Sequence, residues 1–262
     1  MFTLLMGVSG AWAQTATLMS GYGDPLTLTQ FKALAVTTGR FAFVASSNTA
    51  ADNAPRCDHW CGFTSTHNTT TLSEDYLFYL EASGDNYKVK RASDGKYVST
   101  STSSTSFVET GGSEFKLVNR DPNDATKAVT GEQSISFEDP TNSSNHYNAN
   151  AVKYNGGTGA WTTYAVFGPI YIVTVKFVDT NNSVIQSDAT YFVKANTELS
   201  APFISGYAVQ GTSSYTITAD QTVTFTYNAL PAFDPNDVAG KTFTLQCARG
   251  YIYGNGSQVL YS

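Results

Sequence analysis

The sequence has little charge and no long apolar run. Of its 262 residues only 14% are charged, and the formal net charge at pH 7 is -6. Because nucleic-acid binding normally requires a basic surface, this balance argues against a nucleic-acid partner and against adsorption to anionic membranes. No apolar stretch approaches the roughly 18 residues that a membrane-spanning helix needs. We therefore expect neither nucleic-acid binding nor membrane insertion.

Cysteine is also scarce, with three residues in the chain. In an oxidising compartment Cys57 and Cys61 are close enough in sequence to form a small disulfide loop, which would leave Cys247 single. Two reduced thiols are the alternative. His59 lies between the two thiols, but this arrangement does not match the usual ligand spacings of zinc sites. We expect no metal and no cofactor.

Catalytic motifs are missing as well. The histidines, His59, His67 and His146, lie in polar segments without a Gly-x-Ser-x-Gly elbow or a His-Glu-x-x-His motif nearby. Glu138 and Asp139 form the one tempting pair of adjacent carboxylates. Neighbours on a strand point to opposite faces, so this pair would not easily flank one bond, as glycoside hydrolysis requires. We interpret the pair as a solvated turn and expect that the chain is not an enzyme.

The amino end has features of a secretory signal. Residues 2–8 form a short apolar run, and Ala11-Trp-Ala13 before Gln14 has the small-x-small form of a cleavage site, although the positively charged region is missing. We expect residues 1–13 to be the remnant of a signal peptide and the protein to be secreted or displayed at the cell surface. A buried first strand is the alternative.

The rest of the chain favours strands. Aromatic residues reach 13%, Ser, Thr, Asn and Gly are abundant, and no segment keeps a helical period over three turns. We therefore predict an all-β protein. Three hairpin units, each followed by an aromatic-rich strand, favour pseudo-threefold packing. The hairpins are expected at residues 34–44, 87–98 and 135–148, and the closing strands at 76–80, 115–118 and 161–167.

The second unit carries a resemblance to a known family. Its Asp94-Gly-Lys-Tyr97 turn and its Phe115-x-Leu117 strand are similar to those of the ricin-like β-trefoil family. The resemblance implies a β-trefoil-like domain over residues 14–168. Family members use this fold mostly to bind sugars, with an acidic residue and an aromatic platform in each shallow pocket. The family's Gln-x-Trp is absent from all three closing strands, so no sugar-site residue can be transferred.

A more regular β-module follows this first part. Val178-Asp179, Gly206-Tyr207 and the Val-x-Phe-x-Tyr227 strand resemble landmarks of the mucin-binding-protein (MucBP-like) repeat and of similar β-grasp or immunoglobulin-like modules of bacterial surface proteins. The resemblance implies a β-spacer over residues 169–229. Such modules often act as spacers, and only some bind glycans.

A pattern near the amino end returns at the carboxyl end. The residues Lys32, Leu34, Val36, Arg40 and Phe43 correspond to Lys241, Phe243, Leu245, Arg249 and Ile252. Because internal repeats reveal modular architecture, we interpret residues 230–262 as a linker and the truncated start of a second trefoil-like domain. Coincidence is the alternative.

Sugar recognition combines aromatic faces with amide and carboxylate hydrogen bonds and needs no perturbed pKa. The richest clusters of such groups are Asp58, His59 and Trp60 in the first unit, Asp94 and Tyr97 in the second, and Asn145, His146, Tyr147, Asn148 and Trp161 in the third. For each aromatic the alternative is a position in the core. Trp60 is the best candidate for an exposed platform, because it lies in a long polar loop, where large aromatics are less often needed for packing.

These observations lead to one main hypothesis of function. We expect a non-catalytic, exported targeting region that binds mucin-type or polysaccharide glycans and precedes the catalytic domain of a secreted bacterial glycoside hydrolase, by analogy at the level of folds. The alternative is a surface adhesin or structural stalk with the same folds and no sugar pocket.

Overall fold

Strands dominate the protein, which confirms the predicted all-β class. The computed structural model describes residues 25–45, 60–63, 72–121, 124–128, 134–149, 151–156, 163–230, 245–247, 250–255 and 258–261. In this part of the chain the one α-helix has six residues, far fewer than a helix needs to cross a bilayer.

The elements follow one another in two groups along the chain. The first group contains α1 (Leu28–Ala33), the 3-10 helices η2 (Leu34–Val36) and η3 (Glu74–Tyr76), and the strands β1 (Arg40–Ala45), β2 (Phe78–Ser83), β3 (Asn86–Arg91), β4 (Tyr97–Thr100), β5 (Thr105–Val108), β6 (Lys116–Asp121), β7 (Asp124–Ala128), β8 (Ile135–Asp139), β9 (Asn142–Asn148) and β10 (Lys153–Asn155). The second group contains β11 (Tyr164–Asp179), β12 (Val184–Lys194), β13 (Glu198–Ser200), β14 (Tyr207–Gln210), β15 (Ser214–Thr216), β16 (Gln221–Ala229), β17 (Leu245–Cys247), β18 (Gly250–Asn255) and β19 (Gln258–Tyr261).

The segment before β1 corrects the first predicted hairpin, because it is helical. Thr27 and Gln30 form a capping box: the Thr27 hydroxyl accepts from the Gln30 N–H at 3.3 Å, and the Gln30 side chain accepts from the Thr27 N–H at 2.9 Å. Phe31 of α1 is fully buried, with its ring centre 4.8 Å from that of Phe41 in an edge-to-face arrangement. Leu34 is also buried, whereas Val36 is exposed. The cap and the buried face together stabilise helix where a strand was expected.

The other two predicted hairpins are present. In the second, β3 and β4 pair with Lys90 opposite Tyr97, and Gly95 has a positive φ of 70° in the turn. In the third, β8 and β9 pair with Glu138 opposite His146. Both pairings are antiparallel, as expected for strands joined by short turns.

Aromatic rings fill the core of this first group. The ring of Phe43 lies 5.2 Å from Phe63, 5.6 Å from Phe137 and 5.0 Å from Tyr164, measured between ring centres. All four side chains are fully buried. Pairs at such distances contribute about 0.5–1.5 kcal/mol each beyond their area of burial. Many of the aromatic residues therefore pack in the core.

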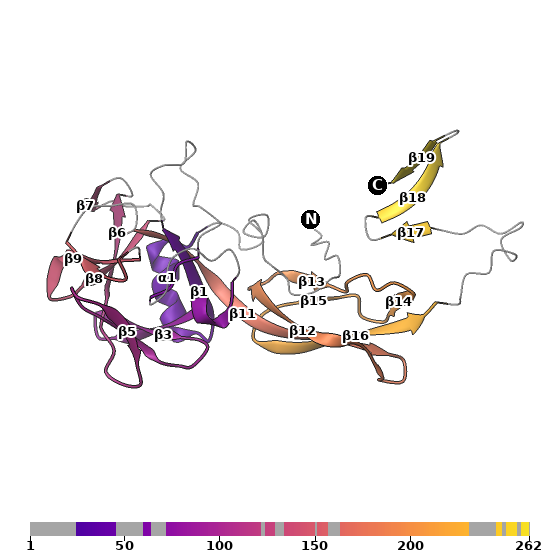
Figure 1. Ribbon diagram of the computed structural model, residues 1–262, viewed down its shortest axis with the longest axis horizontal. Helices are drawn as coiled ribbons and strands as arrows, with labels where there is room; N and C mark the ends of the chain where they lie inside the picture. Colours follow the sequence, from indigo (N-terminus) through magenta and orange to yellow (C-terminus); the bar gives the residue numbers. More distant parts are fainter. Residues whose placement is uncertain are drawn as a thin grey trace, which may run out of the picture.

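Strand β11 continues from the first group of elements into the second (Figure 1). Its first residues pair with β1. From Ile170 onward it pairs with β12 in antiparallel orientation, and from Val173 onward it pairs with β16 in parallel orientation. The expected boundary after residue 168 thus falls inside a strand. The two groups of elements share this strand and have no linker between them at this point.

The β-module has the alternating burial that its sequence predicts. Phe177 of β11 lies opposite Phe225 of β16, and both side chains are fully buried. Tyr227 is buried too, and its hydroxyl donates to the Pro202 carbonyl at 2.8 Å. The predicted corner is present, with Gly206 at a φ of 82°.

The carboxyl end forms a three-stranded antiparallel sheet of β17, β18 and β19. In the repeat pattern, Phe43 and Ile252 both lie in strands, β1 and β18. Val36 lies in η2, however, while its counterpart Leu245 lies in β17. The two copies therefore differ in secondary structure at this position, and the interpretation as a second trefoil-like domain stays a prediction.

Candidate functional site

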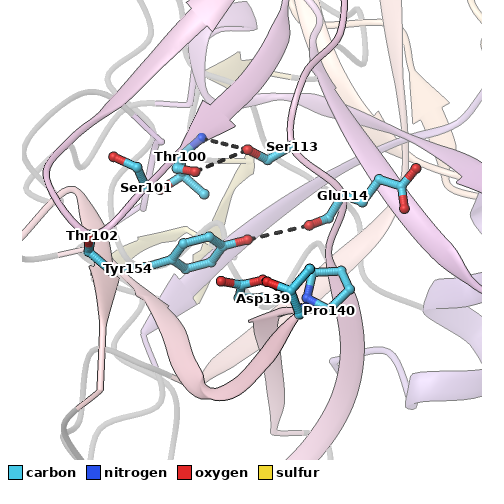
Figure 2. A pocket seen from close by; sticks show the side chains of 9 residues that line it. Thr100, Ser101, Thr102, Ser113, Glu114, Asp139, Pro140 and Tyr154 are labelled. Carbon is cyan, nitrogen blue, oxygen red and sulfur yellow. Dashed lines mark hydrogen bonds between the residues drawn. The ribbon is translucent and has the colours of Figure 1, made fainter.

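A pocket of about 440 Å³ lies where the β4–β5 turn, the loop before β6, the β8–β9 turn and β10 meet (Figure 2). Its volume falls in the range of roughly 300–1,000 Å³ that is typical of small-molecule sites. Six of the nine lining residues carry a hydroxyl group: Thr100, Ser101, Thr102, Ser113, Thr141 and Tyr154. The other three are Glu114, Asp139 and Pro140.

Tyr154 of β10 is held in the pocket by contacts with Glu114 and Ser101. Its side chain is mostly buried, and its ring packs edge-to-face against Phe115 with 6.1 Å between ring centres. Its hydroxyl donates to the Glu114 carbonyl at 3.4 Å, and its N–H donates to the Ser101 carbonyl at 2.8 Å. Burial, together with the nearby carboxylate of Asp139, raises the pKa of Tyr154 well above its usual value. The phenol is therefore a neutral and fixed part of the pocket.

Asp139 is the carboxylate that faces this pocket. Its Oδ1 accepts from the N–H and the hydroxyl of Thr141, at 2.9 and 2.7 Å. Its Oδ2 has a longer contact of 3.4 Å with the side-chain amide of Asn145. Burial opposes ionisation, but the hydrogen bonds outweigh it and hold the pKa of Asp139 below its ordinary value. Asp139 is therefore ionised at neutral pH and retains acceptor capacity on Oδ2.

Glu114 contributes its backbone to the pocket more than its charge. In Figure 2 its carboxylate points away from Tyr154. That carboxylate accepts from the Ser83 hydroxyl at 2.6 Å and from the Asn86 amide at 3.0 Å, and these two bonds lower the pKa of Glu114. The arrangement fixes the loop that carries Glu114 against the β2–β3 hairpin.

Glu138 corrects the prediction of a solvated turn. Its side chain is 0% exposed on β8 and forms a bidentate ion pair with Arg120, with Nε–Oε1 at 2.6 Å and Nη2–Oε2 at 3.1 Å. His146 Nδ1 lies 3.5 Å from Oε1 and 3.1 Å from the Ser136 hydroxyl. Glu138 and Asp139 were expected to point to opposite faces of the strand. The structure agrees with this, because the Glu138 side chain is buried whereas Asp139 lines the pocket.

Among the described residues that were predicted for the third unit, Asn145 is the one that reaches the pocket, through its contact with Asp139. His146 and Tyr147 are buried on β9. Tyr147 packs on Phe63 with 4.7 Å between ring centres and donates to the Gly62 carbonyl, so it is a core residue. The side chain of Asn148 caps a turn by accepting from the Ala151 N–H at 3.0 Å.

The two residues predicted for the second unit have partners on the protein itself. Asp94 pairs with Arg91, with Oδ2–Nη2 at 2.5 Å, and this pair lowers the pKa of Asp94. The Tyr97 hydroxyl donates to Glu81 at 3.1 Å, and Lys90 lies 4.8 Å from the centre of the Tyr97 ring. A sugar at either side chain would have to compete with these contacts.

The expectation that Trp60 is an exposed platform is wrong. Its side chain is 1% exposed, bridges to Val44 of β1 and meets Phe167 edge-to-face with 5.9 Å between ring centres. The polar sequence around Trp60 did not reveal that the chain returns to β1 here. The predicted site residues Asp58, His59 and Trp161 lie outside the described residues.

The structure describes one of the two cysteines of the predicted disulfide. Cys61 is buried, and burial raises the pKa of its thiol to about 12. Cys57 lies outside the described residues, so the disulfide stays a prediction. Among the described ranges, no three His, Cys, Asp or Glu side chains come together as a metal site.

Comparison with known proteins adds no family to this picture. No protein-family model matches the chain, and no curated protein matches it with significant similarity. The resemblances to the ricin-like and MucBP-like families therefore stay predictions.

Proposed function

We propose that this chain is a non-catalytic carbohydrate-binding region of a larger secreted or cell-surface protein, and that its sugar site is the pocket at Asp139 and Tyr154. The observation that carries the proposal is the composition of this pocket. The ionised carboxylate of Asp139, the aromatic side chain of Tyr154 and several hydroxyl groups line a space of about 440 Å³. The proposed folds are a β-trefoil-like domain followed by a β-grasp or immunoglobulin-like module.

The polar groups of the pocket suit a sugar. A sugar hydroxyl is a hydrogen-bond donor, and Asp139 Oδ2 is an ionised acceptor whose own contact to Asn145 is long, at 3.4 Å. Hydrogen bonds to charged groups contribute about 1.5–3 kcal/mol. Pro140 and the edge of the Tyr154 ring supply apolar surface for the C–H groups of the ligand. Polar groups held on a fixed frame beside apolar surface are typical of small-molecule sites.

Binding is favoured over hydrolysis by the environment of the nearest carboxylates. Glycoside hydrolysis uses two carboxylates on either side of the bond, about 5–10 Å apart. Glu138 is fully buried in its pair with Arg120, and the Glu114 carboxylate is held by Ser83 and Asn86. Asp139 is thus the carboxylate available to a ligand, and we propose that the chain is not an enzyme. A glycoside hydrolase whose substrate contains the bound glycan is the proposed context, by analogy.

A glycan-array screen of the full chain tests this function. We expect binding to a defined group among mucin-type glycans and polysaccharides, and at least a tenfold loss of affinity in Asp139→Asn. Asparagine keeps the Oδ1 acceptor for the Thr141 N–H, so the turn is retained. Asp179→Asn is the matched control, since Asp179 Oδ1 accepts from the N–H groups of Asn181 and Ser183 in a similar turn of the β-module. A folded sample that binds no glycan would refute the proposal.

A structural stalk is the second candidate, favoured by the continuous junction between the two groups of elements. Strand β11 runs through that junction, and Arg40 of β1 pairs with Asp220 of the β-module at 2.6 Å. Such a junction is expected of a module that transmits force or sets a distance. Absence of glycan binding, together with cell-surface display of the protein, would favour the stalk.

A further inference from the structure

Resting on the proposed sugar site, we infer that the pocket accepts uncharged sugars and discriminates against acidic sugars, that is, sugars carrying a carboxylate or a sulfate. Two independent features of the lining lead to this inference. One is the charge of the residues that surround Asp139, and the other is the direction of the hydrogen bonds made by the pocket hydroxyls.

The charge of the pocket is negative and has no counter-charge in its lining. Two lining residues, Asp139 and Glu114, are anionic, and none is cationic. The groups that keep Asp139 ionised are hydrogen-bond donors of Thr141, Asn142 and Asn145, and no cation is among them. An acidic ligand would therefore bring its charge next to an uncompensated carboxylate.

The cationic side chains near the pocket, Arg120, Lys153 and Lys88, do not face Asp139. Arg120 is bound to Glu138 on the buried side of β8. Lys153 directly precedes Tyr154 on β10, where adjacent side chains point to opposite faces, and it does not line the pocket. Lys88 acts on the Glu114 carboxylate, which points away from Tyr154 (Figure 2). None of these three residues offers a charge to a ligand beside Asp139.

The hydroxyls of the pocket are mostly acceptors. Each hydroxyl has a single hydrogen to donate, and in four of the lining residues this hydrogen is given to a protein oxygen. The four bonds run from Ser101 to the Ser104 carbonyl, from Ser113 to the Thr100 carbonyl, from Thr141 to Asp139 and from Tyr154 to the Glu114 carbonyl. The hydroxyl of Thr100 is also engaged, with that of Thr105 at 2.5 Å.

This arrangement selects for ligands that donate hydrogen bonds. A neutral sugar supplies a donor with every hydroxyl, and these donors can meet Asp139 Oδ2, the Tyr154 hydroxyl oxygen and the lone pair that Ser113 Oγ keeps beside its bond from the Thr100 N–H at 2.9 Å. An acidic sugar retains such hydroxyls, but its carboxylate or sulfate is an acceptor only, so that group cannot donate to any of these oxygens. Hydrogen bonds that a bound ligand cannot make reduce its affinity.

The size of the discrimination follows from Coulomb's law. Two unit charges about 6 Å apart repel each other by an amount that corresponds to a roughly threefold to hundredfold loss of affinity, for effective dielectric constants of about 80 to 20. Salt screens this repulsion, because the Debye length falls from about 30 Å at 0.01 M to about 3 Å at 1 M. The hydrogen-bond contribution, in contrast, is little affected by salt.

Sugar pairs that differ at one carbon test the inference. The full chain is titrated by calorimetry at low and high salt with galactose and galacturonic acid, glucose and glucuronic acid, and mannose and mannuronic acid. In each pair that binds, we expect the neutral member to bind at least tenfold more tightly at low salt, and the difference to shrink at 1 M salt. Asp139→Asn should weaken the neutral sugar and narrow the difference, while Asp179→Asn should change neither.

The outcomes separate this inference from the function on which it rests. Binding of an acidic sugar as tightly as its neutral partner would overturn the inference and leave the sugar site standing. A difference that Asp139→Asn does not narrow, in a variant with an unchanged melting temperature, would also overturn it. Failure of the folded chain to bind any of these sugars or any glycan of the array would overturn the proposed function, and the inference with it.

Discussion

Arg40 of β1 and Asp220, which directly precedes β16, form a bidentate ion pair between the two groups of elements. Arg40 Nη1 lies 2.6 Å from Asp220 Oδ1, and Nη2 lies 2.7 Å from Oδ2. The Arg40 side chain is 8% exposed and stacks near the Tyr79 ring, 4.8 Å from its centre. Asp220 Oδ1 also accepts from the Ile172 N–H of β11 at 2.9 Å. The pair therefore joins β1, β11 and the β-module at one point.

We expect Asp220→Ala to lower the free energy of unfolding by about 2 kcal/mol, because it leaves the buried Arg40 guanidinium without its carboxylate. Asp220 is 46% exposed, and solvent screening keeps the loss below the roughly 3–5 kcal/mol seen for fully buried pairs. Urea unfolding measures the effect. As control, Asp188→Ala removes an exposed pair with Lys176, 3.0 Å long, and should cost less than about 1 kcal/mol. Equal effects of the two variants would contradict the prediction.

The environment of Glu138 predicts a pH-dependent contribution to stability. Burial disfavours its charge, but the hydrogen bonds from His146 and Arg120 hold the pKa of Glu138 below its ordinary value. A carboxyl whose pKa is lowered by folding stabilises the protein above its unfolded pKa, which is about 4.3 for Glu. This stabilisation is lost as the pH falls through the lower folded pKa.

Glu138→Gln should therefore be less stable than the wild type by about 2 kcal/mol at pH 7, and the difference should shrink progressively as the pH falls below about 4. Urea unfolding of both proteins between pH 7 and pH 3 tests this. Other carboxylates titrate alike in both proteins, so the difference between them reports on Glu138. A difference that stays constant over this range would show that the charge of Glu138 does not stabilise the fold.

Two of the three hairpins expected in the first half, at residues 87–98 and 135–148, could be predicted from the sequence because their patterns are local. The Asp94-Gly95 turn and the alternation on either side indicate β3 and β4, and the apolar alternation of residues 171–179 indicates the second half of β11. The helix α1 escaped prediction because six residues are too few for a periodic pattern. Its capping box of Thr27 and Gln30 was the available sign.

The candidate site was harder to predict, because it has no local pattern. Thr100, Asp139 and Tyr154 come from separate parts of the chain and meet only after β4, β8 and β10 have been brought together. The sequence marks Asp139 only as half of a carboxylate pair, whereas its place in the pocket depends on Glu138 being buried on the other face of β8. The Ser- and Thr-rich run after β4 has the composition of an ordinary solvated turn.

The burial of Trp60 predicts a structural role for this residue. Trp60→Ala should lower the free energy of unfolding by about 3–5 kcal/mol, because it leaves a large cavity beside Phe167. Trp60→Phe should cost clearly less, since it keeps an aromatic ring in the same space. Urea unfolding of both variants gives the comparison. If Trp60→Ala unfolds like the wild type while glycan binding is lost, Trp60 contacts the sugar and the assignment to the core is wrong.

Gly112 supports the loop that carries Ser113 and Glu114 to the pocket. A Cβ atom at this position would lie 2.4 Å from Tyr97 Cβ and 2.7 Å from the Val98 carbonyl oxygen. That carbonyl accepts from the Ser113 N–H at 2.8 Å. A larger residue therefore has to push the loop away from β4.

We expect Gly112→Ala to lower the free energy of unfolding by about 1–3 kcal/mol through overpacking, and to weaken sugar binding because the loop moves. The matched control is Gly211→Ala in the β-module, where φ is 80° and nothing lies within 4 Å of an added Cβ. This control carries backbone strain of about 1–2 kcal/mol between β14 and β15, away from the pocket, and should leave the affinity unchanged. Thermal unfolding and calorimetric titration with the best-binding neutral sugar measure both properties. Equal affinities of the two variants would show that the Gly112 loop does not shape the binding site.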